Sequence, residues 1–309
     1  MKLIFLDADG TLFHHEGYIP DSAIKACIQA QKNGHKVILC TGRQRIEIFG
    51  PMLEIDYDAI IAGSGATIEC EHKIVEENAL TKEESQYLSN YLLTNHIPAN
   101  FESSTGIYAT QYTKDTMLKM VEEQCAGKTE EEKAKHGLTI LTSQITVVDN
   151  IKDLIYNKVS VIDNGKTPYK KIQQDLSDKY DVIPATFAPL GKESGEITSY
   201  HINKATGMDA VIKYFHADIK DTIAIGDGFN DIPMFEKAYL SIAMGNAPQE
   251  IKDKANRITT SLDEDGIYHA FKEWDYERGY LMDTCLSAQD KYKAYLDYFR
   301  IAYENNKSN

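Results

Sequence analysis

The chain has few cysteines and no long apolar run, and each absence excludes a class of protein. Its five cysteines are odd in number, widely spaced and without a Cys-x-x-Cys pair: Cys27, Cys40, Cys70, Cys125 and Cys285. This usage argues against a disulfide framework or a zinc site and favours reduced thiols. No apolar run approaches the roughly 20 residues that a membrane-spanning helix needs, and the first residues show no signal-peptide pattern. We therefore expect a cytoplasmic protein without a membrane partner.

Positive charge is also scarce. Lysine and arginine together number 33 against 47 aspartates and glutamates, which gives a net charge of −14. A general nucleic-acid-binding protein would carry a basic stripe, so we expect no nucleic-acid partner. An anionic substrate stays possible, because a bound cation can reverse the local field. At 309 residues, the chain is long enough for two domains.

Residues 3–11, Leu-Ile-Phe-Leu-Asp-Ala-Asp-Gly-Thr, are the most informative stretch that is present. Four apolar residues predict a buried strand, and two carboxylates one residue apart follow it directly. Buried charges need a partner, and ligands bind at the carboxyl ends of the strands in an open α/β sheet. Asp7 and Asp9 are thus candidates for cation binding and catalysis. The alternative interpretation is a strand followed by an ordinary Asp-Gly turn.

Strand and helix patterns alternate at both ends of the chain, which predicts a parallel, doubly wound, Rossmann-like α/β core. A helix is expected from Asp21 to the Asn33-Gly34 stop. We expect strands over residues 3–6, 37–40, 58–62, 222–225 and 240–244.

The alternation is interrupted in the middle of the chain. Longer helical patterns and β-rich pieces, separated by polar stretches such as 127–135, predict an inserted α+β domain over residues 82–188. The core is then discontinuous, formed by residues 1–81 and 189–274.

Residues 275–309 are predicted to form a C-terminal helical extension. Its apolar-aromatic face either docks on its own core or mediates dimerisation, so the protein is a monomer or a homodimer. This face comprises Tyr292, Tyr295, Leu296, Phe299 and Tyr303.

Side chains at four separate sites along the sequence suit one chemistry, the transfer of a phosphoryl group. Asp7 can attack phosphorus, and Asp9 can protonate the leaving oxygen and later activate water. Asp227, in Gly-Asp-Gly-Phe-Asn-Asp after the strand 222–225, adds an oxygen ligand suited to Mg²⁺. Lys204 is a compact positive charge that offsets charge developing on phosphorus.

A second group is predicted to bind the phosphate oxygens. It comprises Ala8, the Thr41 hydroxyl, the Gly42 amide, Arg43, Lys204 and Asn230. Two alternatives stay open: Thr41 could cap a helix over residues 43–49, and Arg43 could form a structural ion pair. Asp231 is expected to orient its neighbours or cap a helix over 232–237, with direct metal ligation as the less favoured alternative.

These motifs resemble those of the haloacid dehalogenase superfamily, specifically its Cof-like phosphatases. The order Asp-x-Asp-Gly-Thr, Thr-Gly-Arg, Lys before a helix and Gly-Asp-x-x-Asn-Asp is the same. The resemblance implies Asp7 as nucleophile, Asp9 as acid/base and a mobile α/β cap over 82–188. It also implies Asp7, Asp9 and Asp227 around Mg²⁺.

Two positions depart from the family pattern. Lys204 is followed by Ala205-Thr206-Gly207 where the family has Lys-Gly. Ser64-Gly65-Ala66 stands where relatives have Asn-Gly-Ala, so Ser64 is expected to hydrogen-bond more weakly.

The leading hypothesis is a cytoplasmic Mg²⁺-dependent phosphatase of small phosphorylated metabolites, most plausibly sugar phosphates. One alternative is a sugar phosphomutase or phosphotransferase that uses the same nucleophile. Another is a non-catalytic, phospho-accepting binding protein. The inserted domain is expected to select the substrate, and its sequence carries no motif that names one.

Overall fold

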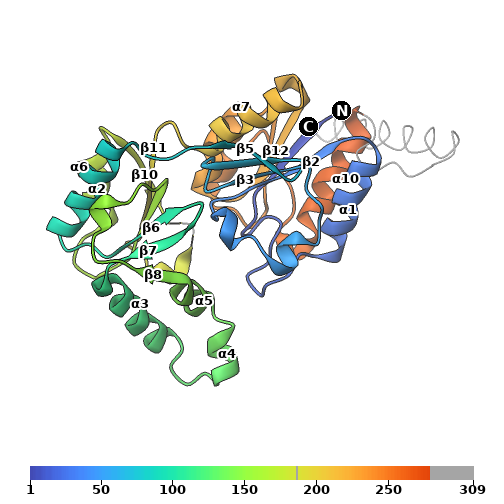
Figure 1. The fold of residues 1–309 in the computed structure, drawn as a ribbon. Helices are drawn as coiled ribbons and strands as arrows, with labels where there is room; N and C mark the ends of the chain where they lie inside the picture. The colour runs from blue at the N-terminus through green and yellow to red at the C-terminus, as the bar shows by residue number, and fades with distance from the viewer. Residues whose placement is uncertain (186, 279–309) are drawn as a thin grey trace, which may run out of the picture.

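The computed structural model describes residues 1–185 and 187–278. It has two lobes, each built on its own β-sheet (Figure 1). The aromatic face predicted for the C-terminal extension lies outside the described residues, as does Cys285. None of the described helices is long and apolar enough to cross a membrane.

The first lobe contains an eight-stranded sheet in the order β14-β13-β12-β1-β2-β3-β4-β5. Strands β14 to β3 in that order run parallel, and β4 and β5 are antiparallel additions at one edge. The bounds are β1 Leu3–Leu6, β2 Lys36–Cys40, β3 Ala59–Ala62, β4 Thr67–Cys70, β5 Lys73–Glu77, β12 Thr222–Gly226, β13 Leu240–Ala243 and β14 Arg257–Ile258.

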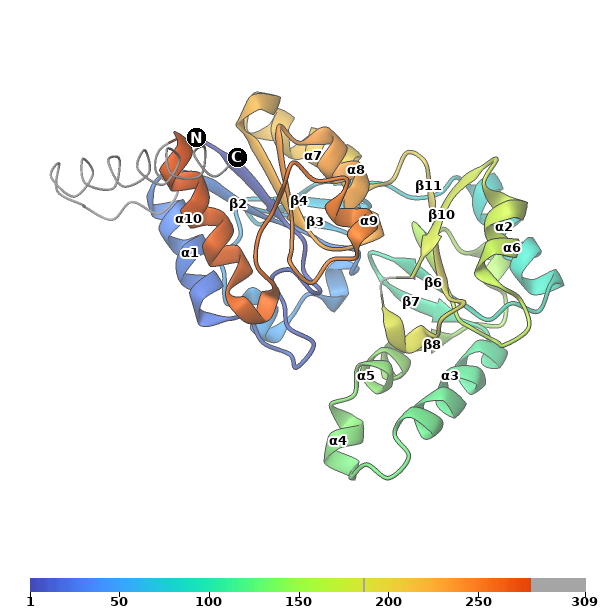
Figure 2. The same cartoon turned by 180° about the vertical axis from the view of Figure 1, so that it is seen from behind.

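Alternation along β1 explains the layers of this lobe. Ile4 and Leu6 face a core cluster formed with α1 (Asp21–Lys32) and α10 (Gly266–Arg278). Leu3 and Phe5 face the opposite cluster, which the remaining helices cover (Figures 1 and 2). These are α7 Lys204–Tyr214, α8 Ile232–Lys237 and α9 Gln249–Lys252. The predicted doubly wound α/β core is therefore confirmed, and its parallel strands end at one shared edge.

The helix predicted over residues 43–49 does not form. Two short 3₁₀ turns, Arg45–Glu47 and Gly50–Leu53, replace it, and Ile48 and Phe49 between them are extended. Pro51 lacks the N–H that a continuing helix would need, so the segment breaks. By contrast, the predicted helices from Asp21 and over 232–237 are present.

The second lobe contains a six-stranded, mostly antiparallel sheet in the order β10-β11-β9-β6-β7-β8. The bounds are β6 Ala99–Ser103, β7 Gly106–Ala109, β8 Ile145–Val147, β9 Lys158–Val161, β10 Tyr180–Pro184 and β11 Gly195–Ser199. Strand β11 pairs with β9 and β10. The chain therefore returns to the first sheet after Ser199 and not at the predicted residue 189.

One face of this second sheet is apolar throughout, whereas the other is polar on β6, β9 and β11 and apolar on β7 and β8. Helices α2 (Lys82–Thr94) and α6 (Tyr169–Leu176) pack on the apolar face and lie on the side away from the first lobe (Figure 1). The other helices of the lobe are α3 Gln111–Gln124, α4 Glu130–Ala134 and α5 Gly137–Gln144. The short helix α4 forms inside the predicted polar connection because Thr129 caps it, accepting from the N–H of Glu132.

Candidate active site

Three carboxylates and one lysine meet at the carboxyl edge of the first sheet. Asp7 follows β1, and Asp227 and Asp231 belong to the loop after β12; their carboxylate oxygens lie within 4.8 Å of one another. The Lys204 Nζ donates to Asp7 Oδ1 and, at 2.5 Å, to Asp231 Oδ1. The structure thus brings Asp7, Lys204 and Asp227 together as predicted. It adds Asp231, which the sequence favoured as an orienting or helix-capping residue over a metal ligand.

The loops around the cluster hold these side chains through backbone contacts. Asp231 Oδ2 accepts from the N–H groups of Asp227 (2.9 Å) and Gly228 (2.8 Å), which folds the loop back on itself. Lys204 is the first residue of α7, and Asn203 caps that helix by accepting from the N–H of Thr206. Lys204 is fully buried. The departure from the Lys-Gly pattern therefore does not keep Lys204 out of the site.

The electrostatics of the cluster favour a cation. Burial and the charge of Asp231 raise the pKa of Asp7 well above its ordinary value, although Lys204 opposes them. Burial and Asp231 likewise raise the pKa of Asp227 to about 7. Burial alone would lower the pKa of Lys204, but Asp231 and Asp7 raise it, so the lysine stays charged. One ammonium among three carboxylates leaves net negative charge, and the all-oxygen donor set fits Mg²⁺.

Two residues that sequence reasoning did not assign hold Asp227 in place. The Thr11 hydroxyl donates to Asp227 Oδ1 at 2.7 Å, and the Asn246 amide donates to Asp227 Oδ2 at 3.3 Å. Gly10, which precedes Thr11, has φ +88°, and a Cβ on Gly10 would lie 2.4 Å from Asp227 Oδ2. Only glycine tolerates that position. The signal for this arrangement was the end of the Asp-x-Asp-Gly-Thr motif. Its threonine, Thr11, makes the contact with Asp227, and its glycine, Gly10, leaves room for the Asp227 carboxylate.

Asp9 is arranged differently from the other acids. Its side chain is half exposed and lies outside the three-carboxylate cluster. Arg43 Nε and Nη2 bind its two carboxylate oxygens at 2.7 and 2.6 Å. Of the two roles considered for Arg43, the ion pair is the one present here.

The residues predicted to bind phosphate lie on the loops after β1, β2 and β12 and at the start of α7. A Cβ on Gly42 would lie 3.2 Å from Asn230 Nδ2 and 3.5 Å from Ser64 Oγ, so these three positions are adjacent. The Thr41 hydroxyl accepts from the N–H of Arg43 at 3.1 Å and so helps to shape its own loop. The Ala8 methyl group lies in the core, and its carbonyl accepts three loop N–H groups. Only the main-chain N–H of Ala8 could therefore contact a phosphate.

Comparison with known proteins agrees with this geometry. A family model described as haloacid dehalogenase-like hydrolase matches residues 4–271. The chain belongs to the haloacid dehalogenase-like hydrolases. The resemblance noted from the motifs is confirmed, and with it the class of enzyme, a phosphoric monoester hydrolase.

Relatives of this hydrolase cover nearly its whole length. YkrA of Bacillus subtilis is 30% identical over 276 residues, covering 88% of this chain and 97% of YkrA. The 5-amino-6-(5-phospho-D-ribitylamino)uracil phosphatase YwtE of the same organism is 26% identical, covering 94% and 99%. The subclass IIB sugar phosphatase BT4131 shares the fold with a TM-score of 0.72 at 23% identity, covering 89% of this chain and 98% of BT4131.

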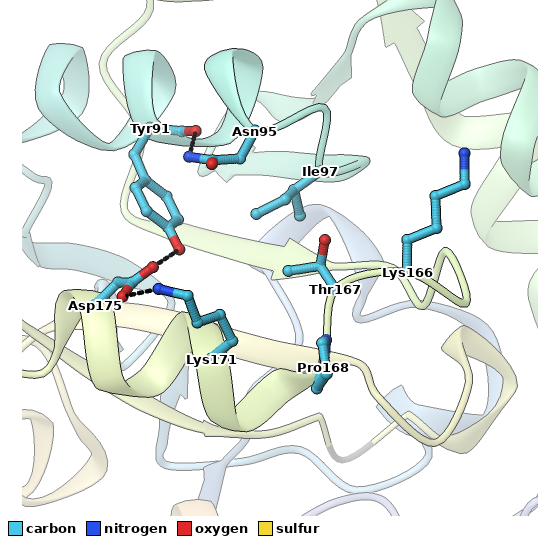
Figure 3. Close-up of a pocket in the computed structure, with 8 residues that line it drawn as sticks. All are labelled: Tyr91, Asn95, Ile97, Lys166, Thr167, Pro168, Lys171 and Asp175. Carbon is cyan, nitrogen blue, oxygen red and sulfur yellow. Dashed lines mark hydrogen bonds and ion pairs between the residues drawn. The ribbon is translucent and has the colours of Figure 1, made fainter.

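The hydrolase also has a pocket of about 230 Å³ far from the carboxylates, on the helical side of the second sheet (Figure 3). The Tyr91 hydroxyl donates to Asp175 there, and Lys171 pairs with the same carboxylate. None of the predicted site residues lines this pocket, which is formed by Tyr91, Asn95, Ile97, Lys166, Thr167, Pro168, Lys171 and Asp175.

The histidines near the motifs stay outside the carboxylate cluster. His14 is buried, and its Nε2 hydrogen-bonds Asp263 at 3.0 Å. Tyr18 stacks on its ring. His201 is exposed.

Proposed function

We propose that this hydrolase is a cytoplasmic, Mg²⁺-dependent phosphatase of small phosphorylated metabolites, sugar phosphates in particular, working through an aspartyl-phosphate on Asp7. The supporting observation is the buried Asp7–Lys204–Asp231–Asp227 cluster at the sheet edge. Asp7 and Asp227, with Asp231 beside them and the main chain of Asp9, would hold the cation. Bound there, Mg²⁺ would offset the negative charge of the phosphoryl oxygens.

The reaction then has two steps. An Asp7 oxygen attacks phosphorus while the bond from phosphorus to the leaving oxygen breaks, and Asp9 gives that oxygen a proton. Water next attacks the phosphorus of the aspartyl-phosphate, Asp9 takes the proton, and inorganic phosphate leaves with Asp7 restored. Arg43 occupies both oxygens of Asp9, so proton transfer requires that Arg43 release at least one of them.

The remaining predicted residues support the phosphoryl group. Lys204 lies between Asp7 and Asp231 and would offset the charge that develops on phosphorus. The Gly42 N–H, the Thr41 hydroxyl and the Asn230 amide would donate to the phosphate oxygens.

We also propose that the second lobe is a mobile cap, inserted into a core formed by residues 1–81 and the chain from after Ser199 to 274. In this arrangement the cap contacts the loop after β2: the Lys158 Nζ donates to the Gly42 carbonyl at 2.9 Å. A substrate would enter when the cap moves away from that loop. The protein would act as a monomer or a homodimer.

The test is to trap the intermediate. With p-nitrophenyl phosphate, whose leaving group needs no proton, an Asp9→Asn variant should accumulate phosphate on Asp7, because the base for the second step is missing. Mass spectrometry of acid-quenched enzyme would locate it. A phosphoryl group on any other residue, or none during turnover, would contradict the mechanism. Release of free phosphate from sugar phosphates separates the phosphatase from a phosphomutase, which would yield an isomer instead.

A further inference from the structure

Six polar side chains share one face of the second sheet. They occupy alternate positions on three adjacent strands, and the strand registers place them in two cross-strand rows. All are at most 9% exposed. We call them the polar face: Asn100 and Glu102 of β6, Lys158 and Ser160 of β9, and Glu196 and Thr198 of β11.

The polar face is directed at the proposed phosphate-binding loops. The opposite face of the same strands is apolar and packs on α2 and α6, which lie away from the first lobe (Figure 1). Besides the contact of Lys158 with Gly42, Gln44 Nε2 donates to Glu102 Oε2 at 3.3 Å. The loop after β2 therefore contacts the polar face directly.

Glu196 lies beside the loop that is proposed to bind the phosphate. Its Oε2 lies 3.9 Å from where a Cβ on Gly42 would be, and Asn230 Nδ2 lies 3.2 Å from the same point. A leaving group attached to a phosphate held by Gly42 and Asn230 would lie beside Glu196. It would then extend along the row Glu196–Ser160–Asn100.

Asn100 lies at the far end of that row and lacks partners. It is fully buried, and neither its amide nitrogen nor its amide oxygen has a hydrogen-bond partner among the described residues. Leaving buried polar atoms unpaired is unfavourable, because they lose their hydrogen bonds to water. Such a cost is typical of a functional position, where a ligand supplies the missing bonds.

The charges of the polar face are not balanced. Lys158 Nζ lies 3.1 Å from Glu102 and 3.6 Å from Glu196, so one ammonium serves two carboxylates. Burial and the Glu102 charge raise the pKa of Glu47 to about 7, although Lys158 opposes them. Carboxylates accept hydrogen bonds from hydroxyl and ammonium groups, and an amide both donates and accepts.

We propose that the polar face is the leaving-group subsite, with Asn100 and Glu196 selecting uncharged or cationic leaving groups that carry hydroxyl or amino groups. A leaving group with a second anionic group is rejected, because Glu196 and Glu102 repel it at low dielectric. This inference rests on the proposed phosphatase function and adds the charge class of the substrate.

The experiment compares kcat/KM for three substrates with Mg²⁺ present: glucose 6-phosphate, 6-phosphogluconate and p-nitrophenyl phosphate. The wild type should prefer glucose 6-phosphate to 6-phosphogluconate. Asn100→Ala should lower kcat/KM for glucose 6-phosphate about tenfold relative to p-nitrophenyl phosphate, the loss expected for hydrogen bonds to one amide. Glu196→Gln should raise kcat/KM for 6-phosphogluconate about tenfold relative to kcat/KM for glucose 6-phosphate. The matched control is Glu250→Gln, an exposed glutamate on α9.

The outcomes separate the two proposals. If the wild type releases no phosphate from any of the three substrates, the proposed function fails, and the subsite with it. If the wild type hydrolyses them but both variants keep its substrate ratios within twofold, the subsite is wrong and the phosphatase function stands. Because the readout is a ratio within one preparation, partial misfolding of a variant does not imitate the result.

Discussion

The two sheets of this hydrolase both bury charged side chains, and they do so by different means. At the first sheet, the carboxylates sit in loops at strand ends, where backbone N–H groups, Thr11 and Lys204 hold them. At the second sheet, the charges stand within the strands, on one face, and pair across them. The residues proposed to catalyse the reaction therefore come from short contiguous motifs. The residues proposed to select the substrate come instead from alternate positions on strands that are far apart in the sequence.

The largest effect is expected from the first sheet. Asp7→Asn should lower kcat with p-nitrophenyl phosphate by about 10⁴-fold or more, the size of loss seen when a nucleophile is removed. The amide is nearly isosteric but a poor nucleophile, so folding should survive. The matched control is Asp21→Asn, whose side chain is 89% exposed at the start of α1. Retention of most of the activity by Asp7→Asn would refute the assignment of the nucleophile.

The same difference explains what could be predicted from the sequence. Asp7, Thr41 and Asp227 were found because each directly follows a short apolar run, and parallel strands must end together. Asp231 was undervalued, since its burial beside Lys204 depends on how the loop folds back. The polar face was missed, because Glu102 and Glu196 are far apart in the chain and look like solvated surface until β9 is placed between them. The signal was present in the period-two alternation, for example Lys158-Val159-Ser160-Val161.

Two buried lysines allow the sheets to be compared directly. Lys204→Met leaves Asp7 and Asp231 without their ammonium partner, and Lys158→Met does the same to Glu102 and Glu196. Each change should lower the free energy of unfolding by about 3–5 kcal/mol, the cost of breaking a buried ion pair on one side. The effect on kcat/KM for p-nitrophenyl phosphate should differ, with a loss of about 10²–10³-fold for Lys204→Met and a much smaller one for Lys158→Met. Chemical denaturation and steady-state kinetics measure the two effects. Equal losses of kcat/KM in the two variants would contradict the different roles proposed for the two sheets.

Removing the cation should reveal the pKa shifts of the first site. In metal-free protein the folded-state pKa of Asp227 is about 7 and that of Asp7 is also raised, so the folded state binds more protons than the unfolded state. Their contribution to stability is present at low pH and is lost as pH rises through about 7. On the proposed function, Mg²⁺ would bind the ionised carboxylates, so its stabilisation of the folded state should grow over the same pH range.

Melting temperatures between pH 5.5 and 8.5 test this, with EDTA in one series and Mg²⁺ in the other. The two curves should diverge as pH rises, and Asp227→Asn should reduce the divergence. Parallel curves would place the cation site elsewhere.

The smallest effect is expected at the start of α2. This helix packs on the second sheet but contacts neither the carboxylate cluster nor the polar face. Thr81 accepts from the N–H of Glu84, and Glu84 binds the Thr81 N–H in return. Thr81→Ala should lower the free energy of unfolding by about 1 kcal/mol, the usual cost of losing such a cap. Since α2 packs on the apolar face of the sheet, the ratio of kcat/KM between glucose 6-phosphate and p-nitrophenyl phosphate should keep its wild-type value. A change in that ratio would mean that the stability of α2 is transmitted through the strands to the polar face, and that the two faces of the second sheet are coupled.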